Sequence, residues 1–386
     1  MEYATSYDVG DRKRGAGLNE DSVAIAVFEE GHRDGRLDAA RGPEPSTARA
    51  EATEEAAGPP EGATDRADHP GTADAAGAAG GPDRSAAAFA LADGAGGHDA
   101  GDVASYIATT VIPEELAPTA VRAARSDPGA FGVDLESPRP HRPRPAELRS
   151  AVAAAVVTAN REILRYADDT GAGAFTTAVA GLCLDGRLHY GWVGDSRLYV
   201  LNGAAGTIER LTADHSAVAD LEAAGEIDAV EAHVHPRGNE ITRALGGHPG
   251  ADPETATVEV DTASVELYAE DVVLATSDGL VDAQTDAPAL FDRYVESGRS
   301  DAVAEAILEA VVTDADIREW VASAPDLDAA ARNLVARANE RGGKDNISTL
   351  LFRDRTLAPT PDSGPARSLA DEGPITDRET LVRSEE

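Results

Sequence analysis

The sequence predicts a layered α+β domain, and two observations carry this prediction. Apolar strand patterns follow one another directly, with turn sequences between and after them, over 178–184, 187–195 and 196–201. Short turns such as Asp185-Gly186 between strand patterns are typical of antiparallel hairpins. Helical patterns likewise lie next to one another along the chain. Strands grouped with strands, and helices with helices, favour a layered domain over alternating βαβ units.

Two strands are expected on either side of a long insertion. The stretches DSVAIAVF (21–28) and AAAFALAD (86–93) are apolar and would be neighbours if the residues between them were removed. Between residues 29 and 88 the chain has no aromatic residue, valine, isoleucine or methionine. Such a composition cannot bury enough apolar surface to offset the entropy lost on ordering. We therefore predict a disordered acidic insertion over 29–86.

Helical periodicity predicts the remaining elements. Val103, Ile107 and Val111 recur at every fourth residue and mark one helical face, which we expect to stop at Pro113. Pro145 opens a longer helix through Ala167, whose inward-facing residues are Leu148, Val152, Val156, Ala159 and Ile163. Further helices are expected at 300–323 and 326–340. A second, shorter insertion at 118–145 and a disordered tail at 356–386 complete the organisation, with the domain spanning 1–355.

Composition excludes several classes of function. The chain has 34 basic and 70 acidic residues and a formal net charge of −36, which repels nucleic-acid phosphates and anionic lipids. Only Lys13 and Lys344 are lysines, and such an acidic, lysine-poor surface favours a halophilic origin. Cys183 is the single cysteine, which excludes an internal disulfide. No apolar run approaches the ~20 residues of a membrane span. We predict a cytoplasmic protein that binds neither nucleic acid nor membrane.

Acidic residues stand at the ends of several strand patterns. They are Asp93, Asp195 and Asp278 after apolar runs, Asp345 in GGKDNIST, and Glu20-Asp21 before the first run. A single acid at a strand end is ordinarily solvated. Carboxylates brought together without partners repel one another, so a cluster of them implies cations. Ligation by oxygen alone selects hard ions such as Mg²⁺ or Mn²⁺ over zinc.

These motifs, in this order, resemble the metal-dependent serine/threonine protein phosphatases of type 2C, especially their prokaryotic branch. The resemblance spans nearly the whole chain outside the insertion and the tail. It rests on NEDS (19–22), LADGAGGHDAGDVAS (91–105), FTTAVAG (175–181), GWVGDSRLYVLNG (191–203), LTADHSAVADLEAAGEI (211–227), ITRALGG (241–247), EDVVLATSDGLVD (270–282) and ANERGGKDNIS (338–348). It implies a four-layer α/β/β/α sandwich of two antiparallel sheets flanked by antiparallel helices.

The resemblance also implies a centre for two Mg²⁺ or Mn²⁺ ions, with a third, weaker site. Asp93 would bridge the two ions and the Gly94 carbonyl would bind one of them. Asp278 and Asp345 would hold the other. The remaining implied ligands are Glu20 through water with Asp21 supporting it, and Asp195 at the third ion.

The implied reaction is hydrolysis of phosphoserine and phosphothreonine in proteins. Two divalent ions ~3.5–4 Å apart lower the pKa of a bridging water. The resulting hydroxide would attack phosphorus directly, with Asp93, Asp278 and Asp345 as the catalytic residues. The expected partners are phosphoprotein substrates and a cognate serine/threonine kinase, and the expected oligomeric state is a monomer.

Two segments depart from the family pattern. The family places an arginine shortly before Asn-Glu-Asp to grip the substrate phosphate, but here GDRKRGAGLNED is two residues longer. Arg12, Lys13 and Arg14 all compete for that role, and we select Arg14. The family's Gly-Thr-Thr reads Phe175-Thr176-Thr177, a change that could alter packing near the sheet. His233 and His235 are interpreted as part of a mobile surface flap.

Two alternatives stay open beside the active protein phosphatase. One is a catalytically silent relative that binds phosphoproteins as a regulator, and the other is a phosphatase of a small phosphorylated molecule. Acids at all the main ligand positions favour activity. Substrate choice lies in loop residues, which the sequence does not decode.

Overall fold

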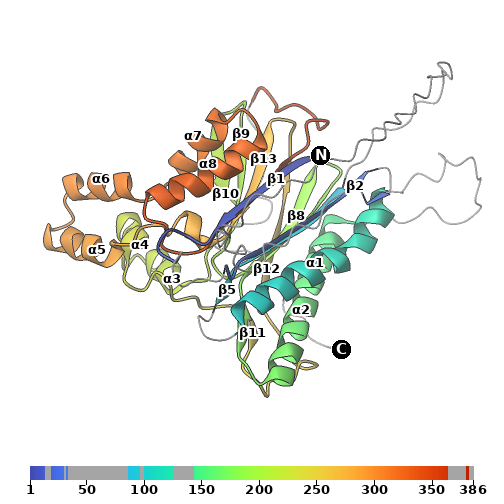
Figure 1. Ribbon diagram of the computed structural model, residues 1–386. Coiled ribbons are helices and arrows are strands. Elements are labelled where there is room, and N and C mark those ends of the chain that lie inside the picture. The colour runs from blue at the N-terminus through green and yellow to red at the C-terminus, as the bar shows by residue number, and fades with distance from the viewer. Residues whose placement is uncertain are drawn as a thin grey trace, which may run out of the picture.

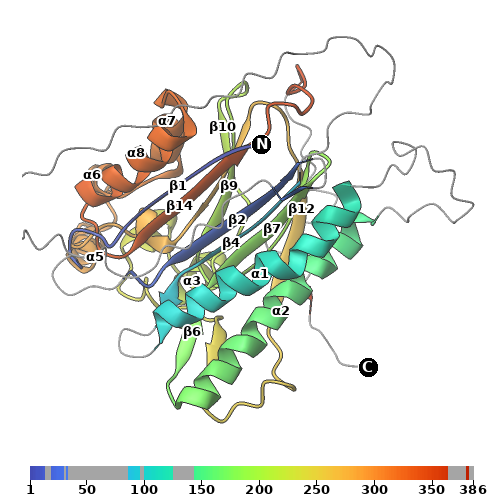
Figure 2. The ribbon, with the colours of Figure 1, turned by 45° about the vertical axis from the view of Figure 1, so that its right-hand side comes forward.

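Two antiparallel sheets face one another, and helices cover both outer sides (Figure 1, Figure 2). The computed structural model describes residues 1–13, 19–29, 32–33, 86–95, 100–124, 143–363 and 380–381. Over these residues it confirms the predicted four-layer α/β/β/α sandwich. None of the described helices is long and apolar enough to cross a membrane.

The larger sheet has the strand order β15-β12-β8-β7-β4-β2-β3. Its strands are β2 (Ser22–Glu29), β3 (His32–Arg33), β4 (Ala86–Ala92), β7 (Ala178–Leu184), β8 (Arg187–Val193), β12 (Val260–Glu266) and β15 (Thr380–Leu381). β2 and β4 pair as antiparallel neighbours, as expected for strands that flank an insertion. Residues 30–31 and 34–85 of that insertion lie outside the described residues.

The predicted hairpin between β7 and β8 is confirmed. Asp185 and Gly186 have φ of 51° and 72°, and two successive positive φ values suit the tight turn that matches strand twist.

The second sheet has the order β1-β14-β13-β9-β10. Its strands are β1 (Glu2–Asp8), β9 (Arg197–Asn202), β10 (Thr207–Arg210), β13 (Asp271–Thr276) and β14 (Ile347–Arg353). An apolar core fills the space between the two sheets, where the rings of Phe89 and Phe352 lie 5.1 Å apart. A small third sheet of β11 (Leu245–Gly247), β6 (Ala174–Thr176) and β5 (Gly94–Ala95) extends one end.

Helices α1 (Gly101–Ala124) and α2 (Pro145–Thr170) cover the larger sheet. The inward face expected for α2 is buried. The expected stop of α1 at Pro113 is wrong, because the helix continues through Pro113 and Pro118. Packing of its far half against the sheet offsets the backbone bonds that proline removes.

The face of α1 is also shifted by one residue from the one expected. The fully buried positions are Ala104, Ala108, Ile112, Leu116 and Ala120, while Val103, Ile107 and Val111 pack at the margin. Small alanines let the helix lie close to the sheet, so the larger valines do not mark the centre of the contact. The start of the predicted insertion at 118–145 is therefore helical as far as Ala124, and 125–142 lie outside the described residues.

Helices α7 (Asp314–Ser323) and α8 (Leu327–Glu340) cover the second sheet. The prediction of a single helix at 300–323 is wrong. The segment is divided into α6 (Asp301–Ala310) and α7, because Thr313 caps α7 by accepting a hydrogen bond from the Asp316 amide. The predicted helix at 326–340 is confirmed as α8.

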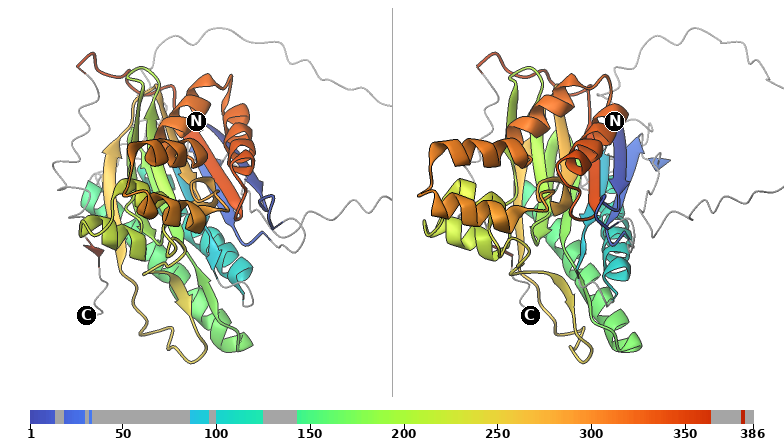
Figure 3. Two further views of the ribbon diagram at one scale, coloured as in Figure 1. Left: turned by 90° about the vertical axis from the view of Figure 1, so that its left-hand side faces the viewer. Right: turned by 60° about the vertical axis from the view of Figure 1, so that its left-hand side comes forward.

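Four short helices form a lobe beside the sandwich, and Figure 3 shows α5 and α6 projecting from it. They are α3 (Ala217–Ala223), α4 (Ala229–Val234), α5 (Ala287–Glu296) and α6. α4, α5 and α6 share a small apolar core of their own around Tyr294 and Ile307. We call α3–α6 the lobe.

The start of the predicted tail packs on the sandwich. Leu357 contacts the core between the sheets, and the Thr360 amide donates to Glu270 Oε2 at 2.7 Å. Residues 364–379 and 382–386 lie outside the described residues.

Candidate functional site

Carboxylates from five separate chain segments lie near one end of the sandwich. Asp93 follows β4, Asp195 lies between β8 and β9, and Asp278 opens a single 3-10 turn, η2 (Asp278–Leu280), after β13. Asp345 precedes β14, and Glu20 and Asp21 precede β2. Asp21, Asp195, Asp278 and Asp345 all raise the pKa of Asp93, so the fold brings the predicted acids within electrostatic reach of one another.

Two threonines fix the backbone at Asp93. Thr177 Oγ1 accepts a hydrogen bond from the Asp93 amide at 3.0 Å, and Thr176 Oγ1 donates to the Asp93 carbonyl at 2.7 Å. The Thr177 amide donates to the same carbonyl at 2.9 Å. This role of the threonine pair was missed from the sequence, where the pair stands out only because Phe175 replaces the glycine of Gly-Thr-Thr. Phe175 packs edge-on against His248, with ring centroids 4.9 Å apart.

Gly94 lies against the segment that carries Glu20. Its amide donates to the Glu20 carbonyl at 3.1 Å, and a Cβ at position 94 would lie 2.4 Å from the Gly101 carbonyl oxygen. No side chain fits there, so glycine is required for this close approach.

Two further polar residues organise the acids and were missed from the sequence. Ser277 Oγ donates to Asp21 Oδ2 at 2.8 Å. Asn346 Oδ1 accepts from the Glu20 amide at 2.9 Å, and its Nδ2 donates to the Val9 carbonyl at 3.1 Å. Asn346 therefore joins the loop after β1, the start of β2 and the start of β14. Ser277 and Asn346 each stand next to a predicted acid in the sequence, and this was the signal that could have identified them.

The site makes its carboxylates hold protons more tightly. Burial, followed by repulsion from neighbouring acids, raises the pKa of Asp93 and of Asp278 well above the ordinary value. Burial raises the pKa of Asp21 to about 6 and that of Asp195 to about 7. Placing these groups together as anions is costly without positive charge.

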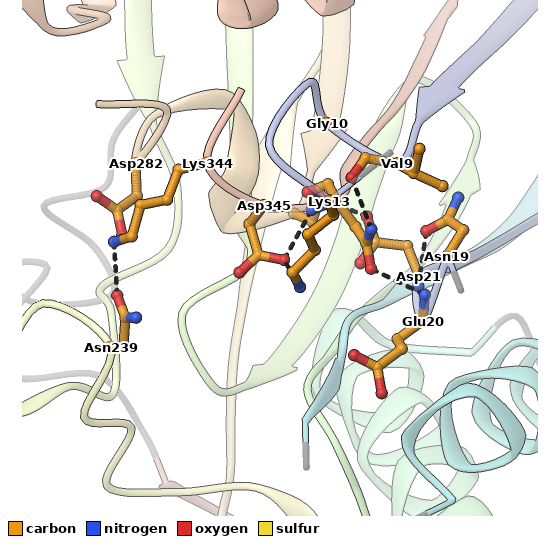
Figure 4. Close-up of polar contacts among 12 residues, drawn as sticks. Val9, Gly10, Lys13, Asn19, Glu20, Asp21, Asn239, Asp282, Lys344 and Asp345 are labelled. Carbon is orange, nitrogen blue, oxygen red and sulfur yellow. Dashed lines mark hydrogen bonds and ion pairs between the residues drawn. The ribbon is translucent and has the colours of Figure 1, made fainter. Parts of the chain in front are cut away.

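Part of that positive charge comes from a lysine. Lys13 Nζ forms an ion pair with Asp345 Oδ1, and the charges of Asp345, Asp93 and Glu20 raise the pKa of Lys13 against the opposing effect of burial. Figure 4 shows Lys13 reaching across to Asp345 near Glu20. Lys13, one of the three candidate phosphate residues, thus lies beside the acids. Arg14 lies outside the described residues.

The second lysine also lies at the acids. Lys344 Nζ pairs with Asp282 Oδ2 and donates to Asn239 Oδ1 at 2.8 Å (Figure 4). Asn239 belongs to the segment that follows α4, so Lys344 joins this segment to the loop after η2. In a chain with only two lysines, both lie beside this group of carboxylates.

The donor set is suited to a hard divalent cation. Asp21 Oδ1 and Asp278 Oδ1 are buried and have no hydrogen-bond partner among the described residues, and such an oxygen is costly to bury unless a cation faces it. All the acids supply oxygen, which hard cations prefer. As they stand, no three His, Cys, Asp or Glu side chains within the described ranges form a ready metal-binding group. The chemistry fits, and closure of the acids onto an ion would require small side-chain movements.

A cavity of about 760 Å³ extends from the acids to the lobe. Asp195, Asp278 and Asp282 line one part of it, and His233 and His235 line the part nearest α4. His233 lies in α4 and His235 ends it, so the predicted flap histidines lie across the cavity from the acids. This cavity is large enough to admit a side chain with flanking polypeptide.

Comparison with known proteins agrees with this arrangement. The family model described as "Protein phosphatase 2C" matches residues 66–312. "Serine/threonine phosphatase stp" of Listeria innocua is 30% identical over 265 residues, which cover 68% of this chain and 82% of that protein. The "Serine/threonine protein phosphatase PstP" of Mycobacterium tuberculosis is 31% identical over 263 residues, covering 68% of this chain and 39% of that protein.

Solved structures show the same fold. The crystal structure of the Mycobacterium tuberculosis serine/threonine phosphatase PstP/Ppp superposes with a TM-score of 0.52 at 25% identity, covering 91% of this chain and 97% of that one. A "bacterial serine phosphatase" gives a TM-score of 0.56 at 22% identity, covering 91% and 96%. The α/β/β/α sandwich with its acids at one end thus defines a protein phosphatase. The chain belongs to the protein phosphatase 2C family.

Proposed function

We propose that this chain is an active serine/threonine protein phosphatase that uses two hard divalent cations, Mg²⁺ or Mn²⁺. The observation that carries the proposal is the convergence of buried, mutually repelling carboxylates beside a cavity open to substrate. Asp93 and the Gly94 carbonyl would hold one ion, with Asp93 shared with the second. Asp278 and Asp345 would hold the second, and Asp195 would serve a weaker third ion. Bound there, such ions supply a water that is nucleophilic near neutral pH.

The chain's own residues would orient the reaction. Thr176 and Thr177 hold the Asp93 backbone from three directions, and Ser277 holds Asp21 so that its other oxygen faces the site. Such supporting bonds keep ligand carboxylates in place without reorganisation during catalysis. Glu20, tied through its amide to Asn346, would orient water next to the acids.

Lys13 is favoured as the residue that meets the substrate phosphate. Its ammonium reaches the acids, and a compact ammonium suits a phosphoryl oxygen as a point charge. With Asp345 holding a cation, the Lys13 ammonium would be available to bind a phosphoryl oxygen of the substrate. Arg12 lines the cavity and is the second candidate. Arg14, the residue selected from the sequence, lies outside the described residues and stays a prediction.

The test is hydrolysis of a phosphothreonine peptide with Mn²⁺, in molar KCl to suit the acidic chain. Activity should require Mn²⁺, vanish with EDTA and return when Mn²⁺ is added in excess. Lys13→Gln, Arg12→Gln and Arg14→Gln should separate the phosphate candidates, since the true one raises KM for the peptide most. Hydrolysis that persists in EDTA would contradict the proposed chemistry.

Phosphoprotein substrates imply a serine/threonine kinase that supplies them. The cytoplasmic location and the monomeric state stay predictions, as does the halophilic origin.

A further inference from the structure

His215 holds the residue next to Asp195 by two hydrogen bonds. The Gly194 amide donates to His215 Nδ1 at 3.0 Å, and the His215 amide donates to the Gly194 carbonyl at 3.0 Å. Because Nδ1 accepts, the neutral ring carries its proton on Nε2. Both backbone groups of Gly194 are therefore bonded to one residue.

The backbone at Gly194 also needs this support. Its φ is 103°, and a Cβ there would lie 2.5 Å from Thr177 Cγ2. Thr177 in turn bonds the Asp93 amide and Ser196 Oγ, the latter at 2.8 Å. A displacement of Gly194 would therefore disturb both Asp195 and the threonine that holds Asp93.

The His215 ring is fixed on its other sides. Nε2 lies 3.2 Å from Asp261 Oδ2, and Arg243 Nη1 donates to Asp261 Oδ1 at 3.1 Å. The ring stacks on Trp192, with centroids 5.9 Å apart and planes inclined by 14°. It is 7% exposed. A side chain held on three sides has one orientation, which suits a group that must fix another residue.

His215 also stands where the chain leaves the sandwich for the lobe. The next residue, Ser216, caps α3 by accepting from the Ala219 amide at 3.2 Å. The Thr242 amide donates to the His215 carbonyl at 2.7 Å, and Ser216 forms an isolated bridge with Ile241. The segment that enters the lobe before α3 and the segment that returns after α4 therefore meet at His215.

We propose that His215 is a positioning residue that fixes the Gly194-Asp195 backbone and links it to the lobe. Its effect on a cation at Asp195 rests on the proposed function, whereas its effect on the backbone does not.

Two near-isosteric variants separate the roles of the two ring nitrogens of His215. His215→Asn keeps an acceptor near the Nδ1 position and loses the link to Asp261. His215→Gln keeps a donor near the Nε2 position and loses the acceptor for Gly194. The matched control is His189→Gln, because His189 is also buried and, among the described residues, its ring bonds Ser264 on the neighbouring strand β12, at 2.8 Å.

The first measurement is hydrogen exchange of the metal-free protein, followed by mass spectrometry. His215→Gln should speed exchange over 193–197 and 216–223 by roughly tenfold or more, as expected when a hydrogen bond worth ~1.4 kcal/mol is lost. His215→Asn should stay near wild type over 193–197. Equal exchange in the two variants, or the same change in the His189→Gln control, would overturn the proposal.

The second measurement is calorimetric titration with Mn²⁺. His215→Gln should weaken the weakest site roughly tenfold, a typical cost of losing a residue that supports a ligand, while the tighter sites stay within a few-fold. Uniform weakening of every site by all three variants would indicate general destabilisation and overturn the positioning role. Absence of Mn²⁺ binding in the wild type would instead contradict the proposed function, and the exchange result would still decide the role of His215.

Discussion

The sandwich and the lobe are held together in different ways. The sandwich has an extensive core between its sheets and a further apolar layer under each helix pair. The core shared by α4, α5 and α6 has five buried apolar residues, and the lobe also has ion pairs such as that between Arg299 Nη2 and Glu231 Oε1 at 2.7 Å. Elements with small cores open at lower free energy than the rest of a protein. The comparison indicates that the sandwich fixes the chemistry and the lobe adapts to the substrate.

Both regions contribute residues to the cavity, Asp278 from the sandwich and His233 and His235 from the lobe. Asp93, Asp278 and Asp345 lie at strand ends of the sandwich, while His233 and His235 reach the cavity from the lobe. Changes in the sandwich should therefore alter catalysis, and changes in the lobe should alter substrate binding.

The largest effect is expected from Asp278→Asn in the sandwich. Loss of this carboxylate should lower kcat for a phosphothreonine peptide by ~100-fold or more, the scale for removing one preorganised charged group. The melting temperature without metal should be unchanged or higher, because a buried carboxylate with a raised pKa is removed. Asp292→Asn, an exposed position on α5, is the control and should leave both unchanged. A kcat near wild type for Asp278→Asn would contradict the proposed metal site.

The next largest effect is on how the free energy of unfolding of the metal-free protein depends on pH. Burial raises the pKa of Asp21 to about 6 and that of Asp195 to about 7, so the folded protein retains protons that the unfolded chain releases. The stabilising contribution of each group is complete below ~pH 4 and is lost as pH rises to about 7. For Asp21 it is on the order of 3 kcal/mol.

Denaturant unfolding in EDTA between pH 4 and 8 measures this loss. Asp195→Asn should flatten the upper part of the profile, and Mn²⁺ at pH 7.5 should restore stability in the wild type by binding the ionised acids. A stability that rises steadily across this range in EDTA would show that these carboxyls are not buried as described.

The different cores of the two regions can be compared directly. Leu351 is a residue of β14 that packs against α8. Leu351→Ala should lower the free energy of unfolding of the whole protein by ~2–5 kcal/mol. Ile307→Ala in the lobe leaves a similar cavity but should speed hydrogen exchange mainly in α4–α6, with the sandwich nearly unchanged. Equal global destabilisation by both variants would show that the lobe and sandwich unfold as one unit.

A smaller effect is expected where the lobe meets the acids. Asn239→Ala removes the bond to Lys344, an exposed hydrogen bond worth about 1 kcal/mol. KM for a phosphopeptide should change a few-fold, with turnover of a small aryl phosphate unaffected. Arg237→Ala breaks only a surface contact with Glu240 in the same segment and should leave both parameters at wild-type values. An equal change in KM in the two variants would remove any special role for the Lys344 contact.

The smallest effect is expected from the acidic insertion. Phe28 on β2 lies opposite Ala86 on β4, so a short turn can join these two strands in place of residues 31–84, which also removes β3. Turnover of a small aryl phosphate should not change. Loss of that activity with an unaltered circular dichroism spectrum would assign the insertion a role at the site.

Prediction from the sequence succeeded where residue pattern alone selects the structure. The hairpin at Asp185-Gly186 and the pairing of β2 with β4 follow from alternation and turn chemistry, which are local. It failed at Pro113 and at 300–323. Whether a proline is tolerated, or whether a helix divides at Thr313, depends on what packs against each segment.

The sequence by itself determined the layered fold class, the strand ends that carry acids and the oxygen-only chemistry of the site, because each depends on residue type and short-range order. Only the tertiary structure decided that Lys13 and Lys344 lie at those acids, that α3–α6 form a lobe, and that His215 holds Gly194. These contacts join residues far apart in the chain, such as Lys13 and Asp345. Their geometry is fixed by packing of the two sheets, which no local pattern encodes.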